Sequence, residues 1–324
     1  MKMSMFHMYV ASCVPDGGIY HYICKNGEIQ LRSKTAADRP MYLTLADNRL
    51  YAVLREPFAD SPNSGVCYWE VDAEGNLHDQ SEIVSTGGRC GCHLTVHDGH
   101  VYVANYLSGS LCMLPEGKVV THSGKGPNPL RQEAPHVHFV GFTPDEKWLL
   151  AVDLGVDAIF MYSPDLQTVK RVDTPSGHGC RHLAWSEDGQ YCFCANELES
   201  TVSVLRYEQD VLTLMDTVSV LPENWQGENT AAAIRVVGER IYVSLRGCDQ
   251  VAMLDYRNGA FTKPRFVDVE GSCPRDIHIC ADVLFSTNET SDSVTVFQLE
   301  KDGMRYTGKK LSVPSPLCVI FAEE

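Results

Sequence analysis

The sequence predicts an all-β protein, a seven-bladed β-propeller with four antiparallel strands in each blade. Two observations support this fold class. One short strand pattern returns seven times along the chain, and the chain ends with a strand that its first repeat lacks. Repeats of 40 to 50 residues made of short strands are typical of propeller blades. We therefore expect residues 1–324 to form a single domain, with the C-terminal strand closing the first blade.

The recurring strand has the form of "VYVAN" at 101–105 or "LLAVD" at 149–153. Its seven copies end at Ser12, Leu54, Asn105, Asp153, Asn196, Leu245 and Asn288. Successive ends are 42, 51, 48, 43, 49 and 43 residues apart. This spacing leaves room for four strands per repeat. If the chain instead formed two separate β domains, the regular spacing would be accidental.

The neighbouring strands follow from the alternation of apolar and polar residues around each copy. A second strand comes after it, as in "AIFMYSPD" and "TVSVLRYE", and a weaker third strand follows a turn. Another strand ending in a turn precedes most copies, as in "HLTVHDG" and "HLAWSEDG". Alternation with a period of two and tight turns predict antiparallel sheets.

The two ends of the sequence predict how the ring closes. No strand of the preceding kind comes before the first copy, whereas "SPLCVIFAEE" at 315–324 has no successor. Pairing these ends would leave no open sheet edge between the last blade and the first. We expect the segment near Val319 to lie beside the strand that contains Tyr9.

Composition narrows the possible partners and the compartment. The net charge is -15, from 42 acidic and 27 basic residues, which opposes binding to nucleic acid or an anionic membrane except at a local basic site. The thirteen cysteines are scattered and odd in number, so we interpret them as reduced thiols of a cytoplasmic protein. The N-terminal segment lacks a continuous apolar stretch, and no later segment has membrane-spanning length.

The repeat alignment also predicts which residues meet at one mouth of the central channel. The start of the innermost strand and the end of the next strand lie at the same face of a blade. The first set contains Pro40, Gly91, His138, Arg181, Ala231, Arg275, and Ser315 or Pro316. The second set contains Cys13, Arg55, Tyr106, Leu154, Glu197, Arg246 and Glu289. A histidine, three arginines and a carboxylate are thus expected in one pocket.

Each member of this group also has an ordinary interpretation. An arginine at a channel mouth is often solvated or ion-paired, and a histidine at a strand start often makes a hydrogen bond there. Clustered arginines repel one another unless an anion or carboxylates neutralise them, which favours a functional site. His136 and His138 could also face a zinc ion, but a catalytic zinc needs a third protein ligand and less cationic surroundings. We therefore expect neither a metal nor a cofactor.

With these residues in place, the sequence resembles the lactonase family of seven-bladed propellers. That family includes a bacterial 6-phosphogluconolactonase and, more distantly, the fungal carboxy-cis,cis-muconate cyclases. The resemblance is strongest in "PHVHFVGFTPDEKWLLAVDLG", "GCRHLAWSEDGQYCFCANELES", "LPENW", "IYVSLRG" and "CPRDIHICADVLFSTNETSD". It implicates His136, His138, Arg181, Glu197, Arg246 and Arg275, and also Glu223 in "PENW".

The resemblance and the residues together predict a lactone hydrolase that acts on a small anionic sugar lactone, most simply 6-phosphogluconolactone. His138, His136, Glu197 and Arg246 are the expected catalytic group, while Arg181, Arg275 and Glu223 are expected to bind substrate. A neutral histidine can deprotonate water, and arginine suits an oxyanion, a phosphate or a carboxylate. No Gly-x-Ser-x-Gly motif occurs, which favours direct attack by water.

Two other functions remain open at this point. One is a cyclase that adds a carboxylate of its substrate to a double bond, with the same arginines as carboxylate ligands. The other is a non-catalytic propeller that binds a ligand or a protein, since one fold hosts many functions. In any of these cases we expect a monomer or a weak homo-oligomer.

Overall fold

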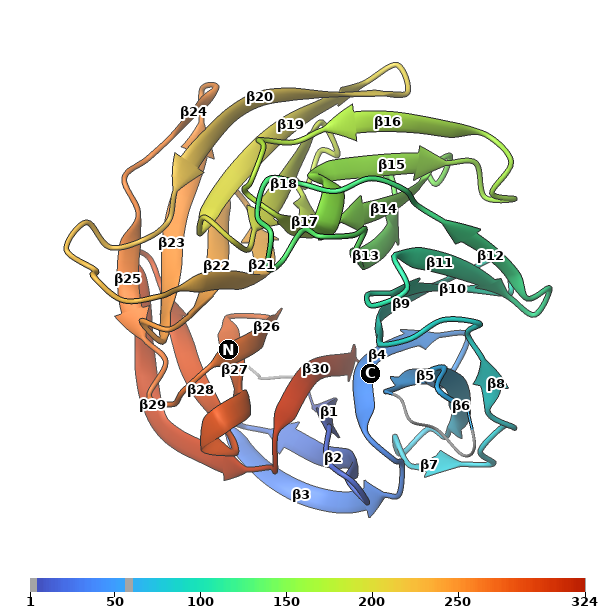
Figure 1. Cartoon of the computed structure of the whole chain (residues 1–324). Helices are drawn as coiled ribbons and strands as arrows, with labels where there is room; N and C mark the ends of the chain where they lie inside the picture. Colours follow the sequence, from blue (N-terminus) through green and yellow to red (C-terminus); the bar gives the residue numbers. More distant parts are fainter. Residues whose placement is uncertain (1–4, 56–60, 324) are drawn as a thin grey trace.

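Seven β-sheets are arranged around a central axis in the computed structural model of the chain, which describes residues 5–55 and 61–323 (Figure 1). Each sheet is a blade whose first strand lies nearest the axis. The prediction of a seven-bladed propeller is confirmed. Residues 1–4, part of the N-terminal segment considered above, lie outside the described ranges, as does residue 324.

The first three blades occupy the N-terminal part of the chain. Blade 1 consists of β30 (Pro316–Glu323), β1 (Phe6–Ser12), β2 (Gly18–Lys25) and β3 (Glu28–Thr35). Blade 2 consists of β4 (Pro40–Ala46), β5 (Arg49–Leu54), β6 (Gly65–Val71), β7 (Leu77–His78) and β8 (Val84–Ser85). Blade 3 consists of β9 (Gly91–His97), β10 (His100–Asn105), β11 (Ser110–Leu114) and β12 (Lys118–Thr121).

The remaining blades follow in order. Blade 4 consists of β13 (Val137–Phe142), β14 (Leu149–Asp153), β15 (Ala158–Tyr162) and β16 (Val169–Asp173). Blade 5 consists of β17 (Cys180–Trp185), β18 (Tyr191–Asn196), β19 (Thr201–Glu208) and β20 (Val211–Ser219). Blade 6 consists of β21 (Thr230–Val237), β22 (Arg240–Arg246), β23 (Gln250–Arg257), β24 (Ala260–Phe261) and β25 (Arg265–Asp268). Blade 7 consists of β26 (Pro274–Cys280), β27 (Val283–Asn288), β28 (Ser293–Glu300) and β29 (Gly303–Ser312).

Two departures from a plain four-stranded blade concern the outer edge. In blade 2 the short strands β7 and β8 both pair with β6, and in blade 6 β24 and β25 both pair with β23. Each pair together replaces one outermost strand. Short 3₁₀ turns, η1 (Leu154–Val156) and η2 (Glu289–Ser291), follow the second strands of blades 4 and 7.

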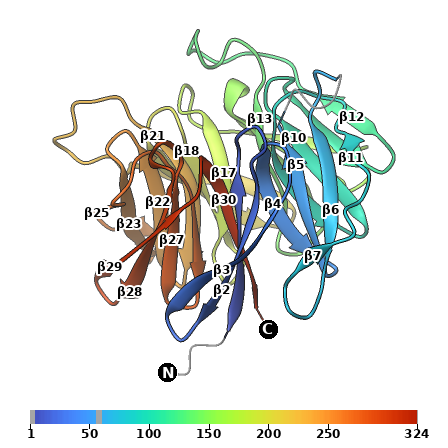
Figure 2. The same cartoon turned by 90° about the horizontal axis from the view of Figure 1, so that it is seen from below.

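The ring closes through the C-terminal strand, as predicted. β30 pairs antiparallel with β1, with Val319 opposite Val10 and Ile320 opposite Tyr9. Side chains of the second strands fill the spaces between blades, and β1 and β14 are buried along their whole length. The start of β1 and the end of β30 lie at one face of the ring, and the long loop between β12 and β13 lies at the other (Figure 2).

A β-bulge recurs near the start of the innermost strand of every blade. In blade 5, for example, Cys180 lies opposite Asn196 and His182 lies opposite Ala195, so Arg181 is the extra residue. The same shift falls at 41, 92, 138, 275 and 317 in other blades, and at 232–233 in blade 6. A bulge redirects one side chain locally, and here it does so at the channel mouth in each blade.

No helix in the described ranges is long and apolar enough to cross a membrane.

Candidate functional site

The bulge residues form a ring inside the channel mouth. Six of them line one small internal cavity: Met41, Cys92, His138, Arg181, Arg275 and Leu317. The sequence alignment therefore placed His138, Arg181 and Arg275 in the right register. It was one residue early in blades 2, 3 and 6, where the bulge falls at Met41, Cys92 and 232–233 instead of at Pro40, Gly91 and Ala231. Leu317 similarly replaces Ser315 or Pro316 in blade 1.

A second ring lies just outside the first, at the end of the second strand of each blade. In blades 3, 5 and 7 the backbone N–H of Tyr106, Glu197 and Glu289 donates to the carbonyl two residues before the bulge, at 2.7 to 2.9 Å. Blades 1, 2 and 4 repeat this hydrogen bond through Cys13, Arg55 and Leu154, at 3.0 Å. The positions predicted for this ring thus share one local geometry, which aims their side chains at the mouth.

Glu197 is the centre of the charged group. Its carboxylate is buried and accepts from Arg181 Nε at 2.9 Å and pairs with Arg246 Nη2 at 3.0 Å, both through Oε2. Its other oxygen, Oε1, accepts from Arg131 Nη2 at 2.5 Å. Burial alone would raise the pKa of Glu197, but Arg246 and Arg181 hold it well below its usual range. Glu197 is therefore ionised and serves three arginines with one charge.

The arginines retain hydrogen-bonding capacity that Glu197 does not use. Arg181 Nη1 and Arg246 Nε are buried and have no hydrogen-bond partner within residues 5–55 and 61–323. Burial and the neighbouring Arg246 lower the pKa of Arg181, but an arginine starts so far above neutral pH that it remains charged. Three positive charges around one carboxylate leave this group with a surplus of positive charge and with unused donors, which is chemistry that suits an anion.

Arg275 lies on the adjacent blade and has its own carboxylate. Its Nη1 is 3.4 Å from Glu289 Oε2, and the thiol of Cys273 donates to the same oxygen at 3.5 Å. Arg275 and Arg181 both line the internal cavity. The charge of Arg275 is thus closer to balance than that of the group around Glu197.

His138 lines the same internal cavity as Arg181 and Arg275. Its side chain is buried, and its Nδ1 has no hydrogen-bond partner in the described part of the chain. The edge of its ring meets Tyr106 at 5.5 Å between centroids, and His182 lies 5.2 Å away. Burial and the nearby Arg181 lower the pKa of His138 well below its ordinary value, so the imidazole is neutral. A neutral imidazole can accept a proton.

His136 occupies a more outward position and is already engaged. Its ring stacks on Tyr106 with centroids 4.4 Å apart and planes 13° from parallel. Its Nδ1 lies 3.1 Å from the Tyr106 carbonyl oxygen, and its Nε2 lies 3.2 Å from Glu133 Oε1. Tyr106 therefore separates the two histidines, and both nitrogens of His136 face oxygen acceptors.

Arg131 is a member of the group that sequence reasoning missed. It lies in the loop between β12 and β13, where it joins Glu197 and also contacts Tyr106 Oη at 3.3 Å. Asn128 Oδ1 accepts from the backbone N–H of Arg131, and the buried Gln132 donates to the Leu154 carbonyl at 2.9 Å. This loop carries no strand pattern, so the repeat alignment could not assign Arg131 to a ring.

Glu223 lies apart from the cluster. Its side chain is 77% exposed and pairs with Lys263 Nζ at 2.8 Å, on the loop before β25. No interaction within the described ranges joins it to the arginines. Nor does any set of three or more His, Cys, Asp or Glu residues there have metal-binding geometry.

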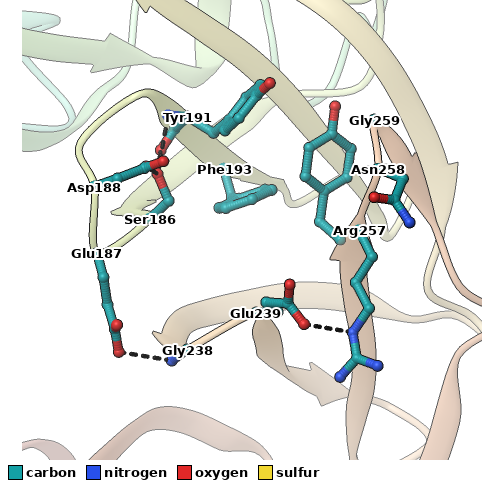
Figure 3. Close-up of a pocket in the computed structure, with 11 residues that line it drawn as sticks. Ser186, Glu187, Asp188, Tyr191, Phe193, Gly238, Glu239, Arg257, Asn258 and Gly259 are labelled. Atoms are coloured by element: carbon teal, nitrogen blue, oxygen red, sulfur yellow. Dashed lines mark hydrogen bonds and ion pairs between the residues drawn. The ribbon is translucent and has the colours of Figure 1, made fainter.

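A wider groove of about 540 Å³ lies between blades 5 and 6 (Figure 3). Its residues include 186–188 and 238–239, in the turns that join the far ends of β17 and β21 to the next strands. It therefore opens at the face opposite the arginines. Its polar groups are internally paired, as Glu239 and Arg257 are at 2.6 Å, so the chemistry of the molecule points to the smaller channel mouth.

Comparison with known proteins gives consistent matches over the whole length. The chain is 28% identical to a Bacillus subtilis 6-phosphogluconolactonase, covering 99% of this chain and all of that protein. The solved structure of a candidate 6-phosphogluconolactonase from Bacteroides fragilis superposes with a TM-score of 0.89 at 27% identity, covering 99% of both chains. A periplasmic gluconolactonase from Pseudomonas aeruginosa superposes with a TM-score of 0.87 at 25% identity, covering 98% of this chain and 99% of that one.

The family model described as "Lactonase, 7-bladed beta-propeller" matches residues 7–321, which include every blade and the charged mouth. This chain belongs to the lactonase family of seven-bladed β-propellers.

Proposed function

We propose that this chain hydrolyses a sugar δ-lactone that carries an anionic group, with 6-phosphogluconolactone as the substrate. The observation that carries the proposal is the unequal charge at the mouth, where Glu197 faces Arg131, Arg181 and Arg246 beside the neutral His138. The names of the Bacillus and Bacteroides relatives support the same substrate.

In this proposal His138 is the general base. It takes a proton from a water molecule as the water oxygen bonds to the lactone carbonyl carbon. The carbonyl oxygen becomes an oxyanion, and guanidinium donors of Arg181 or Arg246 stabilise it. Collapse of this intermediate breaks the bond to the ring oxygen, which takes the proton back from His138. One water and one lactone thus give one hydroxy acid.

The cationic surroundings of His138 suit both halves of this cycle. They keep the imidazole neutral before attack, and they make the imidazolium that follows a strong acid toward the leaving oxygen. The oxyanion forms at the same time and offsets the added positive charge. Glu197 is not the base in this scheme, because a carboxylate paired with three arginines is a weak base. It holds the arginines in place instead.

Arg275 and Arg131 are the proposed ligands of the substrate's anionic group, with His136 and Tyr106 as the wall beside it. Arg131 lies on a loop at the rim, where its side chain is 38% exposed, so it can reach a group that projects from the mouth. Glu223, being paired with Lys263 outside the cluster, would contact only a distant part of a substrate.

Purified protein assayed against 6-phosphogluconolactone, with acid release followed at constant pH, tests the proposal once spontaneous hydrolysis is subtracted. Glucono-δ-lactone is the matched control, because it has the same ring without the phosphate. We expect a higher kcat/KM for the phosphorylated lactone. Equal values would remove the phosphate from the proposal, and no rate above the spontaneous one would contradict lactone hydrolysis.

We also propose the cytoplasm as the compartment. No disulfide joins any of the thirteen cysteines, all of which fall within the described ranges, and most of their side chains are buried. Labelling the thiols with an alkylating reagent in intact cells, before and after a reductant, would test this. Equal labelling supports a reducing compartment, whereas labelling that requires the reductant contradicts it.

A further inference from the structure

The cavity beneath the arginines is lined by an unusual number of buried polar groups. Besides the ring of bulge residues it is bordered by Tyr42, His182 and Asp276, one residue further along their strands. The space it encloses suits about one water molecule. His138 lines it together with Arg181 and Arg275.

Several atoms around this cavity have donors or acceptors to spare. Both ring nitrogens of His182, Nδ1 of His138 and Nη1 of Arg181 are buried without a hydrogen-bond partner among the residues that the structure describes. Buried polar groups in proteins are nearly always satisfied, if not by protein then by ordered water. Four such atoms beside one cavity therefore indicate a bound molecule that serves them together.

The two histidines cannot satisfy each other directly. Their ring centroids are 5.2 Å apart and their planes are inclined by 65°, an edge-to-face arrangement with no hydrogen bond between them. Burial and Arg181 lower the pKa of His182 as well as that of His138, so both rings are neutral. Each ring then carries one N–H donor and one acceptor nitrogen, and the tautomer decides which nitrogen of His138 can take up a proton.

We propose that one buried water molecule bridges His138 and His182, and that His182 is thereby a positioning residue for the base. The water accepts from Nδ1–H of His138 and from Nη1–H of Arg181, and it donates to a ring nitrogen of His182. This arrangement places the His138 proton on Nδ1 and leaves Nε2 as the acceptor that meets the attacking water. The inference rests on the proposed role of His138.

A small anion such as chloride is a poorer occupant. It would accept from Arg181 and His138, but it has no hydrogen to donate to the acceptor nitrogen of His182. The carboxylate of Asp276 at the cavity wall would also repel it. Water both donates and accepts, so it suits the polar groups that border the space.

His182→Phe and His182→Asn test the bridge. Phenylalanine keeps an aromatic ring but removes the acceptor, whereas asparagine keeps an acceptor and a donor. We expect kcat to fall about tenfold in His182→Phe, less than the ~100-fold loss typical for removing a general base, with KM within twofold of the original. His182→Asn should retain most of the turnover. His93→Phe is the matched control, since His93 is equally buried and its ring lies 5.3 Å from His182 but outside the cavity lining.

The imidazole ¹⁵N resonances of His138 provide a readout that does not depend on activity. The unmodified protein should show a protonated Nδ1 and an unprotonated Nε2, and His182→Phe should move the proton partly to Nε2. An unchanged tautomer together with unchanged kcat would overturn the bridge. A bromide soak that gives an anomalous peak in the cavity would overturn water as its occupant. If the protein hydrolyses no lactone, the proposed function fails while the resonances still decide the bridge.

Discussion

Glu197 and Asp276 are two buried carboxylates at the same channel, and their ion pairs are balanced in opposite ways. Glu197 faces Arg131, Arg181 and Arg246, which hold its pKa well below the ordinary value despite its burial. Asp276 faces Arg235 at 2.8 Å, and burial prevails over that one partner and raises its pKa.

The surroundings of the two carboxylates complete the contrast. Asp276 Oδ2 also accepts from the backbone N–H of Val319 at 3.3 Å, and Arg235 Nη1 donates to the Ile234 carbonyl at 2.8 Å. That pair is closed, whereas the group around Glu197 retains buried donors without a partner in the described chain. The difference teaches that a surplus of arginine, rather than the presence of a buried ion pair, distinguishes the site that we propose for the anionic substrate.

Removing each carboxylate charge in turn is the strongest test of this contrast. Glu197→Gln leaves three arginines uncompensated, and we expect it to lower the free energy of unfolding at pH 7 by about 3 to 5 kcal/mol. Asp276→Asn should cost less, because its ionised form is already disfavoured by burial. Urea unfolding would measure both.

Inorganic phosphate should restore part of the stability of Glu197→Gln and little of that of Asp276→Asn, since a ligand stabilises the state that binds it. Potassium chloride at the same ionic strength is the control. Equal rescue of both variants, or rescue by chloride alone, would mean that the two carboxylates do not differ in the way described.

His138→Gln tests whether the charged group around Glu197, with His138 beside it, is a reaction centre. We expect kcat to fall about 100-fold or more, because glutamine fills a similar volume but cannot act as a base. The matched change His93→Gln, at a histidine that is equally buried on the neighbouring strand, should leave turnover nearly unchanged. Initial rates with 6-phosphogluconolactone would measure both, and near-normal turnover in His138→Gln would move the base to another residue.

Arg275→Lys tests substrate binding by the arginines at the channel mouth. Arg235→Lys, which changes the arginine paired with Asp276, is its counterpart. Lysine keeps the charge but loses the planar fork that holds an anion through two hydrogen bonds. We expect KM to rise about tenfold in Arg275→Lys, which corresponds to ~1.4 kcal/mol of binding. Arg235→Lys should leave KM unchanged. Unaltered kinetics in both variants would be evidence against Arg275 as a ligand.

The smallest expected effect concerns stability and pH. Folding lowers the pKa of His138. Below about pH 6.5 the unfolded chain therefore binds a proton that the folded chain does not, and the free energy of unfolding decreases as the pH is lowered. Glu197, whose pKa is also lowered, contributes stability that is lost at much lower pH, whereas the raised pKa of Asp276 acts with the opposite sign.

When the pH is lowered from 7 to 6, the free energy of unfolding should therefore decrease less in His138→Gln than in the unmodified protein. We expect the difference to be less than about 1 kcal/mol. Urea unfolding at several pH values between 5 and 8 would measure the difference. A steeper fall in the variant would show that His138 is protonated in the folded state.

The fold could be predicted almost completely from the sequence because each blade is made of strands and turns that are close together in the sequence. Alternating apolar residues and turns recur at a blade period, and the unmatched strands at the two ends indicate the closure that β30 and β1 make. The outer edges of blades 2 and 6 were less clear, since their last strands are short and divided.

The site was only partly predictable. His138, Arg181 and Arg275 were found by aligning the strands on their turns, whereas Met41 and Cys92 were missed. The turn after the innermost strand spans residues 47–48 and 98–99 in blades 2 and 3 but residues 143–148 and 186–190 in blades 4 and 5, so counting back from it does not reach the same position in every blade. Arg131 reaches Glu197 from an irregular loop, and such a contact depends on tertiary structure that no periodic pattern records.

The pairing of β30 with β1 has a consequence for biosynthesis. A ribosome makes β30 after the other strands of the propeller. This strand nevertheless supplies Leu317 to the cavity wall and the Val319 N–H that donates to Asp276. Until it emerges, the inner edge of β1 is unpaired and the channel is incomplete. The channel mouth can therefore take this form only after β30 has been translated, which makes the mouth one of the last parts of the propeller to be assembled.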